Sequence, residues 1–149
     1  MLSIISFYNI LVLVILIIIY CIRKIMIKKR ALYGDYMLVF IVNKSLKMSK
    51  GKIISQVAHA ITNLSSMMYN DTKLYKSWMA NKKDIKIYQG VLEDIEELCN
   101  KAHKNEIRYA KIHDAGRTQI PSGSNTVLII GPALKEKCEN WFSALEILE

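Results

Sequence analysis

Residues 114–126 carry a dense set of small polar groups: the stretch reads DAGRTQIPSGSNT and lies between two apolar segments. Polar loops at the strand ends of α/β sheets are where ligands usually bind. Asp114 could orient or deprotonate a water molecule, and Arg117 could hold a phosphate or pair with Asp114. Thr118 and Thr126 could hydrogen-bond a carbonyl or a leaving oxygen. The alternative is a well-capped turn in which Asp114 is only an Asx-type hydrogen bonder.

A second polar motif, Lys50-Gly51-Lys52, is predicted at the first turn of a helix. The N–H groups and the dipole of a helix N-terminus are already positive, so lysines there are unfavourable unless an anion binds. The motif therefore suits a phosphate, and the alternative is a solvated basic loop. The P-loop pattern GxxxxGK[ST] is absent from the sequence, so nucleotide hydrolysis is not indicated.

His59 is a candidate base, but the sequence offers no serine or cysteine in an elbow motif for it to activate. A lone histidine on a helical stripe is more often a hydrogen-bonded structural residue. His103 and His113 have no metal-ligand spacing with it, and the three cysteines form neither a CxxC pair nor a cluster with histidine. The sequence therefore predicts no metal, no cofactor and no disulfide framework. Each cysteine is expected to be a small buried apolar residue: Cys21, Cys99 and Cys138.

The elements that must position these residues follow from hydrophobic spacing. Residues 36–43 (YMLVFIVN) form a near-continuous apolar run, which predicts a strand buried on both faces. Residues 52–68 predict a helix with two stripes. The core-facing stripe consists of Ile53, Val57, Ala60, Ile61, Leu64 and Met68, and the opposite stripe of Lys52, Gln56, His59 and Asn63.

The rest of the chain predicts alternating strands and helices. Further strands are expected at 84–89, 106–112 and 125–130, and further helices at 74–79, 91–103 and 134–148. A Gly131-Pro132 break precedes the last helix. The order of elements favours a single α/β domain in which a mixed sheet is covered by helices on both faces.

The 149-residue chain begins with a hydrophobic leader. Residues 4–22 carry no charge, and at ~1.5 Å per residue a helix of that length nearly spans the ~30 Å hydrocarbon layer of a bilayer. No basic region precedes this stretch, whereas RKIMIKKR follows it, so an uncleaved anchor is favoured over a signal peptide. A core helix, the alternative, would normally keep a polar face. We divide the chain into residues 1–30, the anchor with its basic flank, and residues 31–149, the domain.

Composition and charge agree with this division. With 52% hydrophobic residues, 6 Gly and 2 Pro, the chain is neither disordered nor collagen-like. The net charge is +8, but the leader holds five basic residues and no acid, so residues 31–149 carry only +3. The positive-inside tendency places the basic flank, and the domain behind it, on the cytosolic side.

Together, the motifs resemble the type 2 peptidyl-tRNA hydrolases of archaea and eukaryotes over residues 36–149. The resemblance is carried by KGKI and QVAHA within residues 50–60, by DAGRTQI from Asp114, and by GSxTVLxIGP from Gly123. Ser49 stands where the family often has glycine, and Pro121 comes one position earlier than the usual proline of that loop.

The resemblance implies a compact α/β domain with a mixed four-stranded sheet. It also implies an enzyme that cleaves the ester between a peptide and the 3′ ribose of tRNA, releasing peptide and free tRNA for reuse in translation. The implied active-site residues are Lys52, Asp114, Thr118 and Thr126, with Gln56, His59 and Arg117 beside them.

Such a substrate requires cations for its phosphates and a small polar cluster for its ester carbonyl. Because the domain has a modest net charge, we expect a local basic patch rather than a global field. The patch would consist of Lys47, Lys50, Lys52, Lys111 and Arg117. A water activated by Asp114, with Lys52 stabilising developing negative charge, is one route. A hydroxyl nucleophile at Thr118 or Thr126 is the other.

The expected partners are peptidyl-tRNA as substrate, a membrane bound through residues 4–22 and, because members of the family are often dimers, a homodimer. The domain would face the cytosol, with the mitochondrial outer membrane and the endoplasmic reticulum as candidate locations. The alternative to an enzyme is a membrane-tethered adaptor that binds tRNA or a protein without turnover. The complete set of Lys52, Asp114, Thr118 and Thr126 favours the enzyme, because an adaptor has no physical need for it.

Overall fold

The computed structural model describes residues 2–69, 71–80, 84–116 and 120–149, and the chain divides after Gly34 into two compact units. The first unit is one helix, α1 (Leu2–Tyr33). Its stretch Tyr8–Met26 is long and apolar enough to cross a membrane by length and composition, and it overlaps the expected span at residues 8–22. Cys21 is exposed on this helix. The expectation of burial was wrong for Cys21, because a unit of one helix has no core of its own.

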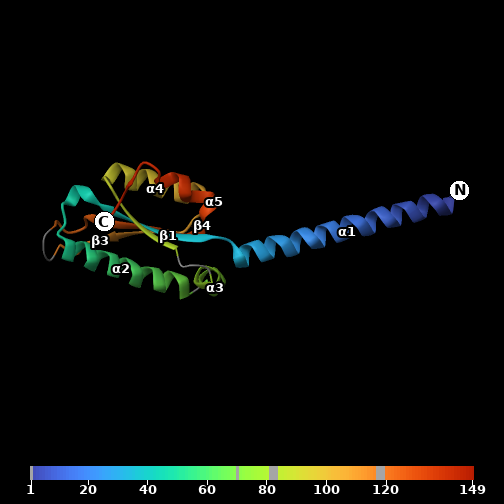
Figure 1. Ribbon diagram of the computed structural model, residues 1–149, viewed down its shortest axis with the longest axis horizontal. Helices are drawn as coiled ribbons and strands as arrows, with labels where there is room; N and C mark the ends of the chain where they lie inside the picture. Colours follow the sequence, from blue (N-terminus) through green and yellow to red (C-terminus); the bar gives the residue numbers. More distant parts are fainter. Residues whose placement is uncertain (1, 70, 81–83, 117–119) are drawn as a thin grey trace. The chain divides into compact units, whose positions relative to one another are not determined.

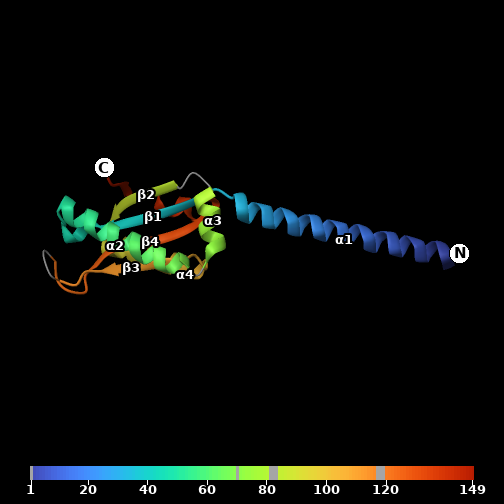
Figure 2. The ribbon, with the colours of Figure 1, turned by 90° about the horizontal axis from the view of Figure 1, so that it is seen from below.

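The second unit is built on a five-stranded mixed sheet, in the order β3-β4-β1-β2-β5. Strand β1 pairs in parallel with β2 and antiparallel with β4, whereas β3 on β4 and β5 on β2 are antiparallel. All eight residues of β1 are buried, as the apolar run predicted. The strands are β1 (Tyr36–Asn43), β2 (Asp84–Gly90), β3 (Tyr109–His113), β4 (Asn125–Leu134) and β5 (Glu146–Ile147). Figure 2 shows the order of the larger strands.

The expected count of four strands was wrong, because the C-terminal segment does not form one long helix. It forms the short helix α5 (Lys135–Cys138), a 3-10 turn η2 (Glu139–Phe142) and then β5. Phe142 is 1% exposed and stacks on Tyr88 of β2 with 5.6 Å between ring centroids. Burial of this ring turns the chain back towards β2, where β5 pairs with its outer edge.

Strand β4 also runs past its expected end at residue 130 and continues through Gly131-Pro132 to Leu134. The register between β1 and β4 shifts between Met37 and Val39, which accommodates the extra residue. Gly131 has a φ of 100°, and a Cβ there would come within 2.8 Å of the Met37 carbonyl oxygen. Only glycine fits this close approach of the two strands.

Helices cover both faces of the sheet, as predicted (Figure 1). One core lies beneath α2 (Lys50–Tyr69) and α3 (Thr72–Ala80), where Ala60, Leu64 and Met68 pack against β1 and β4. The other lies beneath α4 (Leu92–Lys104) and the C-terminal segment, and it buries Cys99 and Cys138, as expected. Burial raises the pKa of the Cys138 thiol to about 11. The residues described in both cores all belong to the second unit.

The two stripes of α2 differ from the prediction at two positions. Gln56, expected on the polar side, is 3% exposed, and Ile61, expected in the core, is 48% exposed. A glutamine can be buried at this depth because both ends of its amide have hydrogen-bond partners. The helix is therefore rotated slightly from the orientation that apolar spacing alone favours, and Gln56 faces inward.

Candidate active site

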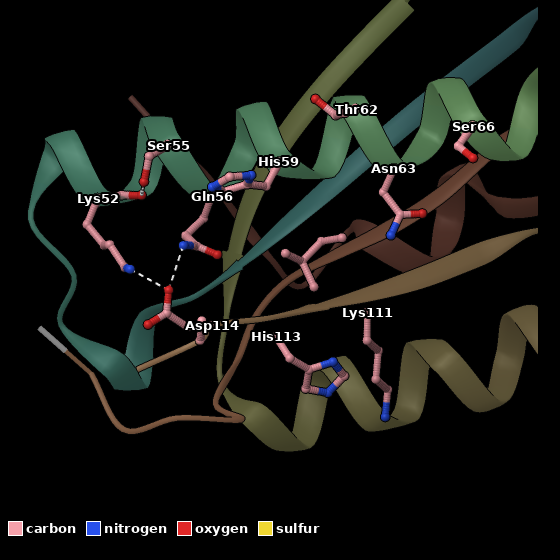
Figure 3. A pocket seen from close by; sticks show the side chains of 12 residues that line it. Lys52, Ser55, Gln56, His59, Thr62, Asn63, Ser66, Lys111, His113 and Asp114 are labelled. Atoms are coloured by element: carbon pink, nitrogen blue, oxygen red, sulfur yellow. Dashed lines mark hydrogen bonds and ion pairs between the residues drawn. The ribbon is translucent and has the colours of Figure 1, made fainter. Parts of the chain in front are cut away.

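The first two turns of α2 meet the end of β3 at a cluster of three side chains (Figure 3). Lys52 and Gln56 are one helical turn apart and point to the same side. Asp114 follows the last residue of β3, and its Oδ1 accepts hydrogen bonds from Lys52 Nζ and, at 2.9 Å, from Gln56 Nε2. The side chains of Lys52 and Asp114 are 12% and 7% exposed, so the ion pair is largely withdrawn from solvent.

The second oxygen of Asp114 holds the following loop. Oδ2 accepts the Gly116 N–H at 2.9 Å, which is the Asx-type turn that the sequence left as an alternative. Gly116 has a φ of 73°, and a Cβ there would lie 2.6 Å from the Ser122 backbone. The carboxylate therefore caps the turn with one oxygen and faces Lys52 with the other.

The surroundings of Asp114 favour its ionised form. The hydrogen bond from Lys52 is the largest cause that holds the pKa of this carboxyl below its usual range. Burial acts in the opposite direction, and the Gly116 N–H and Gln56 reinforce the lowering. Asp114 is consequently a carboxylate at neutral pH, paired with an ammonium group.

Gln56 links this pair to the core through Thr126. Thr126 is fully buried on β4, and its Oγ1 lies 2.8 Å from Gln56 Oε1 and 3.0 Å from the Ile112 carbonyl oxygen. Its single hydroxyl proton is shared between these two acceptors. This contact fixes the Gln56 amide so that its NH₂ group points at Asp114. Thr126 therefore contacts the cluster through Gln56.

The cluster lies at one end of a cavity of about 850 Å³ between α2 and β3. His59, which the sequence singled out, lines this cavity together with residues that it did not single out as functional. Those on α2 continue the stripe of Lys52, Gln56 and His59 at helical spacing, and those on β3 directly precede Asp114. They include Ser55, Asn63, Ser66, Ile112 and His113. Ser55, Asn63 and Ser66 could have been predicted as cavity residues, because they continue this stripe at helical spacing.

The predicted basic patch is only partly assembled. Lys50 is exposed at the start of α2, and Lys47 is exposed three residues before it. Lys111 lines the cavity, but its Nζ lies 2.6 Å from Glu96 on α4, and this hydrogen bond raises the pKa of Lys111. Arg117 and Thr118, both predicted site residues, lie outside the described residues. Lys52 differs from the exposed Lys47 and Lys50 because it is largely buried and forms an ion pair with Asp114.

Comparison with known proteins gives a family to this arrangement. Residues 36–148 match the family model described as Peptidyl-tRNA hydrolase PTH2. The chain is 32% identical over 116 residues to a peptidyl-tRNA hydrolase of Staphylothermus marinus, a match that covers 76% of this chain and 96% of the relative. The relative thus consists almost entirely of the part that matches.

Two eukaryotic relatives are longer. The chain is 37% identical over 105 residues to the probable peptidyl-tRNA hydrolase 2 of Dictyostelium discoideum, covering 69% of this chain and 50% of the relative. It is 35% identical over 101 residues to the mitochondrial peptidyl-tRNA hydrolase 2 of Bos taurus, covering 66% of this chain and 56% of the relative. The matched family model spans the strands and helices that build the Lys52–Asp114 site. This chain belongs to the PTH2 family of peptidyl-tRNA hydrolases.

Proposed function

We propose that this protein is an enzyme that hydrolyses the ester bond of peptidyl-tRNA and releases the peptide and free tRNA. The observation that carries the proposal is the largely buried ion pair of Lys52 and Asp114 at one end of a polar cavity. Ester hydrolysis requires a group that takes a proton from water and a positive group for the developing oxyanion. The pair supplies both within one cluster.

In the proposed reaction, water is the nucleophile. As its oxygen bonds to the ester carbonyl carbon, Asp114 takes one proton from it, and the carbonyl π electrons move to the carbonyl oxygen. Collapse of this tetrahedral intermediate breaks the bond to the ribose oxygen, which receives the proton from Asp114. The products are the free peptide carboxyl group and the ribose hydroxyl of the tRNA. We favour water over a Thr126 hydroxyl because Thr126 is fully buried and already hydrogen-bonded.

Lys52 stabilises the transition state in this scheme through a change of partner. In the resting site its ammonium group faces the Asp114 carboxylate. As Asp114 gains a proton it loses its charge, while negative charge grows on the carbonyl oxygen of the substrate. The ammonium group then interacts with the oxyanion more strongly than with the neutral acid, which lowers the barrier. Gln56 and, behind it, Thr126 position Asp114.

Lys47 and Lys50 are proposed to contact tRNA phosphates, because they are exposed near the catalytic pair. Lys111 and Arg117 complete the proposed binding residues, and His59, exposed on the cavity wall, is proposed to contact the 3′ end. The 3′ end of tRNA is single-stranded, so phosphate contacts and stacking suit it better than groove reading.

The proposed function is tested by incubating the protein with an N-acetylated aminoacyl-tRNA and measuring release of the N-acetyl amino acid. We expect multiple turnovers per protein molecule, at a rate well above spontaneous ester hydrolysis. Tight binding of tRNA with no release above the spontaneous rate would instead identify a tethered adaptor.

We also propose that residues 4–22 anchor the protein in a membrane with residues 31–149 in the cytosol, and that the domain forms a homodimer. The anchor is supported by the apolar stretch of α1 and the basic flank behind it. The dimer is supported by large apolar side chains exposed on α2 and α3: Ile54, Ile61, Tyr69 and Tyr75. The mitochondrial outer membrane and the endoplasmic reticulum are the proposed locations.

The full-length chain is expected to stay in the membrane pellet on extraction with alkaline carbonate, and its domain is expected to be cut by protease added from the cytosolic side. The matched control is residues 35–149, which contain every described residue of both cores and should remain in the supernatant. Release of the full-length chain by carbonate would refute the anchor. Protection of the domain inside sealed vesicles would refute the orientation.

A further inference from the structure

The cavity is longer than ester cleavage requires. Lys52 and Asp114 lie at one end, and Asn63 and Ser66 line it further along the same helix (Figure 3). At ~1.5 Å per residue, Ser66 is about 20 Å from Lys52 along α2. The opposite wall is β3, through Lys111, Ile112 and His113. The reacting carbonyl and the ribose occupy only the Asp114 end, so the rest of the cavity is available to another part of the substrate.

The wall formed by β3 is an edge of the sheet. In the described part of the chain, β3 has one ladder neighbour, β4. The Gly131 N–H donates to the Arg108 carbonyl at 2.8 Å, so these two residues form a hydrogen-bonded pair. In an antiparallel ladder such pairs alternate, and the register then makes Ala110 with Ile129 the next one. The N–H and C=O groups of the intervening residue Lys111 therefore point away from β4, towards the open edge.

We propose that the peptide of peptidyl-tRNA binds in extended form along this edge and pairs with β3 as an added parallel strand. This inference rests on the proposed function, because it places the ester at Asp114. The peptide is esterified through its C-terminus, so its last residue lies beside His113 and its earlier residues extend back past Lys111. That direction is the direction of β3 itself, which makes the pairing parallel.

Parallel pairing assigns two hydrogen bonds to Lys111. With the last peptide residue opposite His113, the Lys111 carbonyl accepts the amide N–H of the penultimate residue. The Lys111 N–H donates to the carbonyl of the fourth residue from the ester. Both bonds involve only main-chain atoms, which every peptide offers. Asn63 and Ser66 on the facing wall are exposed and uncharged. They therefore do not repel peptide side chains of either charge. Pairing with this edge would therefore accept peptides irrespective of their sequence.

The inference is tested with the full-length protein and a series of N-acetyl-oligoalanyl-tRNAs of one to five residues. We expect kcat/KM to rise by about three- to tenfold from one to two residues, where the penultimate N–H first appears, and again from two to three, where the acetyl carbonyl takes the place of the fourth residue's carbonyl, and to level off beyond three. Equal kcat/KM for all lengths would overturn strand pairing while leaving peptidyl-tRNA hydrolysis intact. Hydrolysis of none of the substrates would overturn the proposed function and the inference with it.

A second series removes single main-chain N–H groups from the tetrapeptide substrate. N-methylation of the penultimate residue should lower kcat/KM by about three- to tenfold, whereas N-methylation of the residue before it should have little effect, because that N–H points away from β3. Replacing the penultimate amide by a backbone ester removes the same N–H without adding a methyl group, and it should reproduce the loss. Equal losses at both positions, or no loss at either, would contradict pairing with β3.

Discussion

Replacing Asp114 with asparagine is expected to lower kcat by about 100-fold or more, which is the range for loss of a positioned acid–base group. The asparagine keeps the size of the side chain and can still accept the hydrogen bond from Gln56 through its one oxygen. It cannot take a proton from water at neutral pH. Release of an N-acetyl amino acid from its tRNA at saturating substrate measures the effect.

The matched control for this variant is Asp71→Asn. Asp71 also pairs with a cation, Arg108, at 2.7 Å, and its other oxygen accepts the Leu74 N–H at 3.0 Å, but it does not line the cavity. We expect this variant to retain nearly full activity. Because Asp114 also holds the Gly116 turn, the melting temperature of both variants must be compared. A folded Asp114→Asn protein with unreduced kcat would remove Asp114 from the mechanism.

Lys52→Met is expected to lower kcat/KM by about 10²–10³-fold, the usual loss when one donor to an oxyanion is removed. Methionine retains the length of the side-chain stem, so the packing at the start of α2 is preserved while the charge is lost. The control is Lys135→Met, which removes an ammonium group paired with Asp84 at 2.7 Å and Asp35 at 3.3 Å, outside the cavity. Single-turnover rates of ester cleavage distinguish the two variants.

The same variant predicts a change in pH dependence. Asp114 must be ionised to act, so the rate falls as the pH drops through its pKa. Lys52 is the main cause that lowers this pKa, and in the unaltered protein the fall therefore lies below the ordinary carboxyl value of about 3.9. Without Lys52, burial still raises the pKa, and the residual activity should begin to fall at higher pH. An acid limb at the same pH in both proteins would show that Asp114 is not the titrating group.

Much of the fold could be predicted because it depends on local spacing. The continuous apolar run predicted β1 as a strand buried on both faces, and the helical spacing of apolar residues predicted α2, although Gln56 and Ile61 lie on the sides opposite to those expected. The C-terminal segment was mispredicted because Cys138 and Phe142 have helical spacing, but the stacking of Phe142 on Tyr88 is a long-range contact. No local pattern reveals that the last residues will pair with β2.

Sequence alone named candidate residues for the site but not the contacts that the structure shows between them. Lys52 and Asp114 were each identified, yet their ion pair joins residues 62 positions apart and depends on where α2 crosses the end of β3. The sequence instead suggested Arg117 as a partner for Asp114, because it is near in the chain. Gln56 was assigned to the exposed side because an amide is polar, and only its partners in three dimensions make its burial favourable.

Helix α2 has consequences for how this protein can change over generations. One face of the helix holds Ala60 and Leu64 in the core, and the next face presents Lys52 and Gln56 to the cavity. A substitution that loosens the core face also displaces the side chains of the proposed active site, so selection for turnover would act on folding as well. The outward face around Ile54 contacts neither the core nor the cavity, so in the proposed homodimer only the contact with a second copy restrains substitutions there.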